Sequence, residues 1–140
     1  MLRSQRFRDQ HDGLLEIVAL ISKELTVGHL AQDAKEVRTL LSKFMGKLQI
    51  HLAMEDKSLY PSLMSHGDEK IKAMATQFSE EMGFIAEAAE SYNNDWATAK
   101  LIQENPAEFI AATRGLIDVL GKRIQKENSH LYAALDKLSA

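Results

Sequence analysis

The stretch HLAMEDKSLYP, residues 51–61, decides how this chain is organised. In an α-helix, His51 and Glu55 lie one turn apart on the same face, and Phe44 and Leu48 continue that face before them. Two side chains that can bind a cation therefore lie in an otherwise apolar stripe. A histidine and a glutamate at this spacing also occur together by chance, so the pattern needs support from the rest of the chain.

Four segments share this helical spacing of apolar residues. They predict helices over residues 4–25, 33–60, 69–92 and 105–138. The strict alternation of apolar and polar residues that marks a strand does not occur. Amphipathic helices joined by short connections predict an all-α fold, an antiparallel up-down-up-down four-helix bundle.

The ends of these helices carry their own signals. Pro61 is expected close to the end of the second helix, Asp68 is expected to cap the third, and Asn105 is expected to cap the fourth. Gly28 is expected to stop the first helix, with a polar connection through His29 and Gln32. Residues 65–68 are expected to form a turn, and residues 93–105 a connection with a short helical turn around Trp96.

With 140 residues, 45% of them apolar, the chain has the size of one domain, which we expect to span residues 1–140. Its net charge of −3, with the signs interspersed, provides no basic surface for nucleic acid. No apolar run is long enough to cross a membrane, and the N-terminus lacks the core of a signal peptide, so we expect a cytoplasmic protein. The chain has no cysteine, so any metal ion must be held by His, Asp and Glu.

His11 lies on the apolar face of the first predicted helix. It fills the gap between Phe7 and Leu14, and Val18 and Ile21 continue the face. A single histidine on such a face is more often a hydrogen-bonded core residue than a metal ligand. Its role therefore depends on which other polar residues lie at the same depth.

The second half of the chain repeats the pattern of the first. A shift of 72 positions superimposes His51 on Arg123, and the same shift superimposes Glu55 on Glu127. A shift of 71 relates the first and third helices. In a bundle with twofold pseudosymmetry, equivalent positions face each other across the core at the same depth. The residues expected to converge on one layer are His11, His51, Glu55, Met82, Arg123 and Glu127.

These motifs resemble those of hemerythrin-like domains of the HHE cation-binding type. The matching features are His11-Asp12, His51-x-x-x-Glu55 followed by Leu59-Tyr60-Pro61, and Glu127-x-x-x-Leu131-Tyr132. The resemblance covers essentially the whole chain. It implies a bundle that holds an oxo-bridged pair of irons with five histidines and two bridging carboxylates, and a role in dioxygen, nitric oxide or iron handling. It assigns His11 and His51 to one iron, and it assigns Glu55 and Glu127 to the two bridges.

The ligands of the other iron are missing. The resemblance places its histidines at Phe78, Met82 and Arg123. Phenylalanine cannot ligate a metal, methionine is a poor ligand for iron, and the fixed positive charge of arginine repels a cation. Near this gap, His130 lies towards the bundle end and Glu81 lies one position off the stripe. One half-site is therefore expected to be emptied while the other is complete.

The complete half-site consists of His11, His51, Glu55 and Glu127. This set suits one divalent ion, with Fe(II) preferred and Zn(II) or Mn(II) as alternatives. A competing interpretation is a metal-free core, in which Arg123 lies between the two carboxylates and makes charge-assisted hydrogen bonds with both. A metal ion, Arg123 or both together must neutralise the two carboxylates, because unpaired buried charges cost several kcal/mol each.

Two functions follow from these interpretations. The first is a metal-binding or sensing domain related to iron, oxygen or nitric oxide, with a metal ion and a small diatomic gas as expected partners. The second is a metal-free interaction or regulatory module. An oxidase is a weaker interpretation, because the resemblance implies two irons for the two-electron reduction of dioxygen. We therefore expect no enzymatic activity, and neither nucleic acid nor membrane as a partner.

Overall fold

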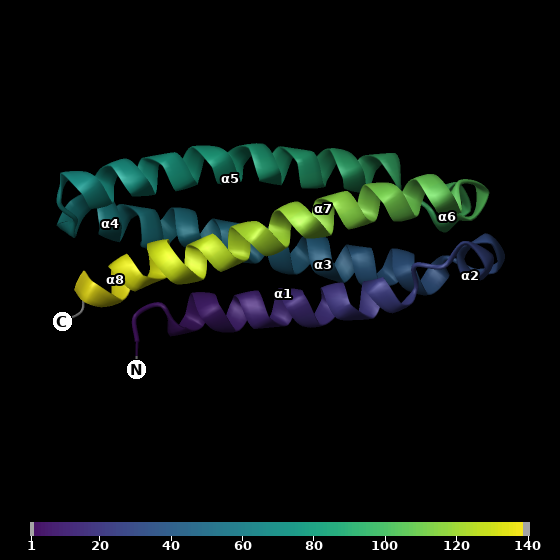
Figure 1. Cartoon of the computed structure of the whole chain (residues 1–140), viewed down its shortest axis with the longest axis horizontal. Coiled ribbons are helices and arrows are strands. Elements are labelled where there is room, and N and C mark those ends of the chain that lie inside the picture. The colour runs from purple at the N-terminus through teal and green to yellow at the C-terminus, as the bar shows by residue number, and fades with distance from the viewer. Residues whose placement is uncertain (1, 139–140) are drawn as a thin grey trace.

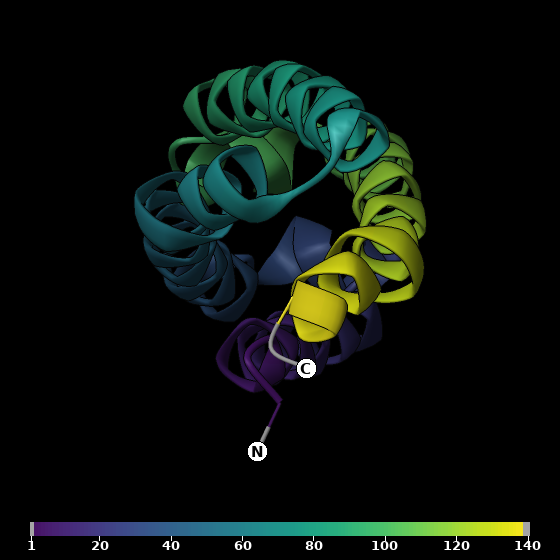
Figure 2. The same cartoon turned by 90° about the vertical axis from the view of Figure 1, so that its left-hand side faces the viewer.

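Four helical rods pack around a common core in the computed structural model, which describes residues 2–138 (Figures 1 and 2). The rods are α1 (Gln5–Lys23), then α3 (Lys35–Met54) continued by η1 (Glu55–Leu59) and α4 (Tyr60–His66), then α5 (Glu69–Asp95), and finally α7 (Pro106–Lys126) continued by η2 (Glu127–Leu131) and α8 (Tyr132–Leu138). Successive rods run in opposite directions (Figure 1). Residues 2–138 contain no strand, so the predicted all-α four-helix bundle is confirmed.

Two short helices at one end of the bundle were not predicted as such. Helix α2 (Val27–Gln32) lies in the first connection, and α6 (Ala99–Glu104) lies in the third. Trp96 is not in a separate turn but directly follows α5, which is three residues longer than predicted. Leu30 and Ile102 are completely buried, so the short helices close this end of the core. Burial of one apolar residue from each stabilises these short helices, which would be marginal in isolation.

The predicted helix ends are partly confirmed. Asp68 caps α5, because its Oδ1 accepts a hydrogen bond from the backbone N–H of Ile71 at 2.9 Å. Asn105 occupies the N-cap position of α7, but its side chain does not cap the helix and instead donates to the carbonyl of Leu101. Pro61 does not end the second rod, which continues to His66.

The second and the fourth rod each include one π-helical segment. Segments η1 and η2 begin at Glu55 and Glu127, which are related by the 72-residue shift. In each, a tyrosine N–H donates to the glutamate carbonyl five residues earlier: Tyr60 to Glu55, and Tyr132 to Glu127. The widened turn before Pro61 relieves the clash between a proline ring and the preceding turn. Because η2 has the same geometry without a proline, the π segments belong to the repeat itself.

The core consists of two apolar clusters with a polar layer between them. One cluster includes Leu14, Leu48 and Leu120, and the other includes Leu59 and Leu131. The buried polar side chains between the clusters are His11, His51, Glu55, Arg123 and Glu127. No helix among the described residues is long and apolar enough to cross a membrane. The fold therefore concentrates its buried charge in one layer near the middle of the bundle.

Candidate metal centre

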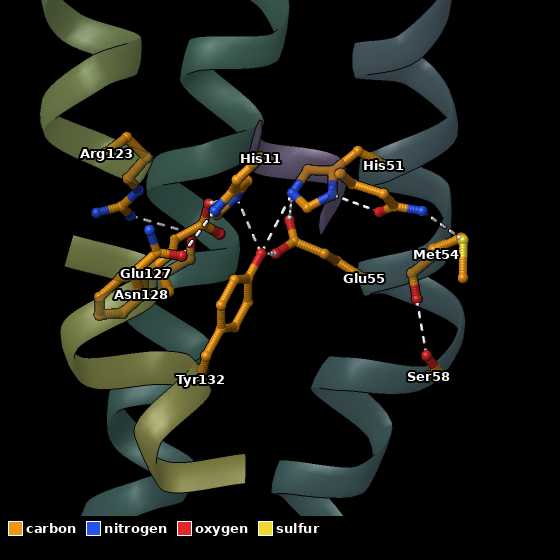
Figure 3. Close-up of polar contacts among 11 residues, drawn as sticks. His11, His51, Met54, Glu55, Ser58, Arg123, Glu127, Asn128 and Tyr132 are labelled. Atoms are coloured by element: carbon orange, nitrogen blue, oxygen red, sulfur yellow. Dashed lines mark hydrogen bonds and ion pairs between the residues drawn. The ribbon is translucent and has the colours of Figure 1, made fainter. Parts of the chain in front are cut away.

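Four side chains from three rods converge in this polar layer (Figure 3). His11 projects from α1, His51 from the end of α3, and Glu55 and Glu127 from the first residues of the two π segments. Each residue is at most 2% exposed, and one ligand atom from each lies within 4.8 Å of all the others. The structure thus brings together all four residues that the sequence predicts as metal ligands.

Both histidines are oriented by hydrogen bonds on the side away from the cluster. The Nδ1 of His11 lies 2.9 Å from the Oδ1 of Asn128, and the Nδ1 of His51 lies 2.6 Å from the Oε1 of Gln10. An amide oxygen can only accept, so each Nδ1 carries the proton and each Nε2 presents a lone pair to the cluster. Metal-ligating histidines are commonly held in this way by an outer hydrogen-bond partner.

The two carboxylates face these lone pairs. The Oε1 of Glu127 lies 3.1 Å from the Nε2 of His11, and the Oε1 of Glu55 lies 3.5 Å from the Nε2 of His51. Two fully buried oxygens, Glu55 Oε1 and Glu127 Oε2, have no hydrogen-bond partner among the described residues. Acceptors that face one another in this way need a cation or protons between them. The donor set therefore fits a bound metal ion.

Burial shifts the protonation of all four groups towards neutral forms. It raises the pKa of Glu55 to about 9, with the charge of Glu127 adding to the shift. It also raises the pKa of Glu127 above its ordinary value. Burial lowers the pKa of His51 to about 3 and lowers that of His11. In the absence of an ion, neutral acids and neutral imidazoles are thus the favoured forms.

Tyr132 is a residue of this site that the sequence did not identify. Its hydroxyl donates to the Oε2 of Glu55 at 2.8 Å and lies 3.0 Å from the Nε2 of His11 and 3.3 Å from the Nε2 of His51. The sequence signal that could have pointed to Tyr132 was the repeat, because the 72-residue shift superimposes Tyr60 on Tyr132. The helical stripe excluded Tyr132, because residues five apart lie on different faces of a regular α-helix. The π turn aligns residues five apart and so brings Tyr132 onto the face of Glu127.

Arg123 is buried as predicted, but its partner is not the predicted one. Its Nη2 lies 2.6 Å from the Oε2 of Glu81 and donates to the carbonyl of Phe78 at 3.3 Å, and its guanidinium lies 4.3 Å from the centre of the Phe78 ring. The predicted hydrogen bonds to Glu55 and Glu127 are absent from the described contacts, so that prediction was wrong. Glu81 is 44% exposed, so this ion pair keeps one carboxylate hydrated and costs less than burying two.

We expect Arg123→Leu to lower the free energy of unfolding by only about 1–2 kcal/mol. The cost is limited because Glu81 remains hydrated and leucine suits the apolar surroundings. Chemical denaturation of the metal-free protein measures it, with Lys43→Leu, at an exposed position on α3, as the control. A loss of roughly 3–5 kcal/mol would instead show that Arg123 neutralises the buried carboxylates.

Two hollows adjoin the cluster. An enclosed cavity of about 60 Å³ is lined by His11, His51, Arg123 and Glu127 together with apolar side chains. A more open cleft of about 200 Å³ between η1 and α5 reaches Glu55 from outside. Met82 lines both hollows, so both reach its flexible side chain. The inner cavity has room for about one or two water-sized molecules beside the cluster.

Comparison with known proteins agrees with this geometry. The model of the hemerythrin HHE cation-binding domain matches residues 3–135. No curated protein and no solved structure shows significant similarity to the chain. The family match includes all four rods and every residue of the cluster. The chain therefore belongs to the hemerythrin HHE cation-binding domain family.

Proposed function

We propose that this domain binds a single divalent metal ion through His11, His51, Glu55 and Glu127. The convergence of four buried ligand atoms, two of them on histidines oriented by outer hydrogen bonds, is the observation that carries the proposal. Two imidazoles and two carboxylates suit Fe(II) first, and also Zn(II) or Mn(II). A bound iron would supply redox and gas-binding chemistry.

The role that we propose is binding or sensing related to iron, oxygen or nitric oxide rather than catalysis. The small cavity beside the cluster supports it, because its volume suits a diatomic molecule better than an organic substrate. Met82 and the cleft provide a path for small ligands between the cavity and the surface. No residue of the cluster is free to act as a base or nucleophile once all four hold an ion.

The proposal of one ion rather than two rests on the opposite half of the layer. Phe78, Met82 and Arg123 stand where the family resemblance expects three histidines, and all three are buried. Arg123 fills this half with a fixed positive charge that is paired with Glu81. A second cation there would meet both electrostatic repulsion and a lack of ligands.

A metal-free interaction or regulatory module is the second candidate. The observation that favours it is the hydrogen bond from Tyr132 to Glu55 within a layer of neutral groups. A neutral, hydrogen-bonded layer avoids much of the cost of burying charge without any ion.

Metal analysis separates the two candidates. We expect protein reconstituted with Fe(II) under anaerobic conditions, or with Zn(II), to retain one ion per chain after removal of excess metal. The ion should stabilise the fold by about 2.7 kcal/mol at a free concentration of about 100 Kd. Elemental analysis and thermal unfolding measure these two quantities. No retained metal and no thermal shift would favour the metal-free module.

The pH dependence of binding gives a further prediction. Because Glu55 and Glu127 must lose protons to bind an ion and burial raises the pKa of both, raising the pH should increase the apparent affinity for Zn(II). We expect roughly a tenfold increase per unit between about pH 6 and 8, measured by competition with a chelator. The histidines contribute little in this range, because burial lowers the pKa of each. An affinity independent of pH would contradict the carboxylate ligands.

A further inference from the structure

The hydroxyl of Tyr132 lies among the candidate ligand atoms of the cluster (Figure 3). Three atoms surround it, at 2.8 Å (Glu55 Oε2), 3.0 Å (His11 Nε2) and 3.3 Å (His51 Nε2). The hydroxyl has one proton to donate, and both Nε2 atoms are bare acceptors because each Nδ1 carries the ring proton. Once Glu55 and Glu127 have lost their protons to an ion, this one proton cannot satisfy all three acceptors.

The same distances are those expected between ligands of one metal ion. Two donors that lie at right angles, each about 2.1 Å from an ion, are about 3.0 Å apart. The three separations around the Tyr132 oxygen all fall close to this value. A phenol oxygen is also a hard donor of the kind that iron accepts, as in proteins in which a tyrosine binds haem iron.

We propose that Tyr132 is a fifth ligand of the metal ion, an inference that rests on the proposed function. With a divalent ion, the neutral hydroxyl donates a lone pair and loses no proton. With Fe(III), the O–H bond breaks, an O–Fe bond forms and the proton passes to solvent, while the oxidation state of the iron is unchanged. The π segment η2 makes this arrangement possible, because it places Tyr132 on the same helix face as Glu127.

Tyr60 provides a matched control within the chain. It is related to Tyr132 by the 72-residue shift, follows a π segment in the same way and is also buried. Its hydroxyl has no hydrogen-bond partner among residues 2–138. The two tyrosines thus share a local structure, but only Tyr132 contacts the cluster.

Loading the protein with Fe(III) from ferric nitrilotriacetate tests the assignment. We expect a visible phenolate-to-Fe(III) charge-transfer band and tyrosinate modes in the resonance Raman spectrum. Tyr132→Phe should lose both while retaining close to one iron per chain, and Tyr60→Phe should keep both. If Tyr132→Phe does not fold, the double variant Tyr60→Phe/Tyr92→Phe leaves Tyr132 as the one tyrosine of the chain and should still show the band.

The outcomes separate this inference from the proposed function. Bound iron without a charge-transfer band, or a band that persists in Tyr132→Phe, would overturn the role of Tyr132 and leave the four-residue site in place. Wild-type protein that retains neither iron nor Zn(II) would overturn the metal site and the fifth ligand together. A band lost in the double variant but kept in Tyr132→Phe would assign the phenolate to another tyrosine.

A separate observation concerns the surface between α5 and α7, which includes none of the four candidate metal ligands. A groove of about 540 Å³ runs between these helices, and small residues such as Ala88, Ala111 and Gly115 line it. Phe84, 72% exposed, and Val119, 47% exposed, project from the two sides. We call this surface, which consists of the groove with Phe84 and Val119, the α5/α7 face.

Two contacts fix how the helices of this face are aligned. Arg123 pairs with Glu81, and the hydroxyls of Tyr92 and Thr113 lie 2.6 Å apart. Between these two contacts, Phe84 is level with Val119, because it follows Glu81 by three residues and Val119 precedes Arg123 by four. If a twofold axis parallel to these helices related two copies of the chain, Phe84 of each copy would therefore contact Val119 of the other.

The charges of α5 and α7 favour a twofold axis parallel to the helices over a twofold axis that runs across them. Apart from the Arg123–Glu81 pair, residues 80–95 of α5 contain four acidic residues and no basic ones, whereas α7 has three basic and two acidic residues. An axis across the helices would place α5 against α5 and bring the acidic residues together. The parallel axis places α5 against α7 and brings Glu87, next to the groove, within about one helical turn of Arg114 in the other copy. We infer that the α5/α7 face binds a second copy of this chain.

Sedimentation equilibrium at about 100 μM protein tests the dimer. We expect Phe84→Glu to give monomers and Ile50→Glu, at a 62% exposed position on α3, to remain dimeric. Glu87→Arg and Arg114→Glu should each weaken self-association, and mixing the two should restore a heterodimer. A monomeric wild-type protein, or a dimer that survives Phe84→Glu, would overturn the inference.

Discussion

Glu55→Gln should abolish metal binding while leaving the metal-free fold intact. Glutamine keeps the shape of the side chain but provides a neutral amide in place of a charged ligand. We therefore expect the affinity for Zn(II) or Fe(II) to fall at least about 100-fold, which is more than the loss of a hydrogen-bond partner of a ligand usually costs. The free energy of unfolding without metal should change by less than about 1 kcal/mol. The reason is that burial raises the pKa of Glu55 to about 9, so the wild-type side chain is already neutral near pH 7.

The matched control for this substitution is Asp56→Asn. Asp56 follows Glu55 in η1 but is exposed, so its loss should change neither metal affinity nor stability appreciably. Metal titration and chemical denaturation of both variants complete the comparison. Unchanged metal binding in Glu55→Gln would remove Glu55 from the site, and strong destabilisation without metal would show that the carboxylate is charged and paired in the wild type.

The bundle and the four residues of the candidate metal site could be predicted because each depends on a periodic pattern. His11 and His51 lie on apolar stripes, and such a stripe must face the core. The 72-residue shift then relates Glu55 to Glu127 and so places both at one depth. These are properties of regular helices and twofold repeats, which a sequence records directly.

Tyr132 and Glu81 could not be predicted, because their roles depend on departures from regularity. Tyr132 reaches the cluster through a π turn, and a pattern based on a regular α-helix assigns it to another face. Glu81 lies off the apolar stripe, but the long side chain of Arg123 extends to it at the edge of the core. A stripe shows where a Cα atom lies and not where a long charged side chain ends.

The proposal that half of the layer lacks metal ligands leads to the second large effect that we expect. Phe78→His, Met82→His and Arg123→His together should raise the metal content from one ion per chain to two. The triple variant supplies three imidazoles at the family positions and removes the guanidinium whose charge repels a cation.

Iron titration followed by elemental analysis and visible spectroscopy measures the gain, with Met82→His alone as the control. The single variant keeps the Arg123–Glu81 pair and should still bind one ion, because one added imidazole does not offset the fixed positive charge beside it. Two irons per wild-type chain, with oxo-bridged absorption bands, would show that the half-site is not degenerate. A triple variant that folds but retains one ion would show that the loss of the second site involves more than these three side chains.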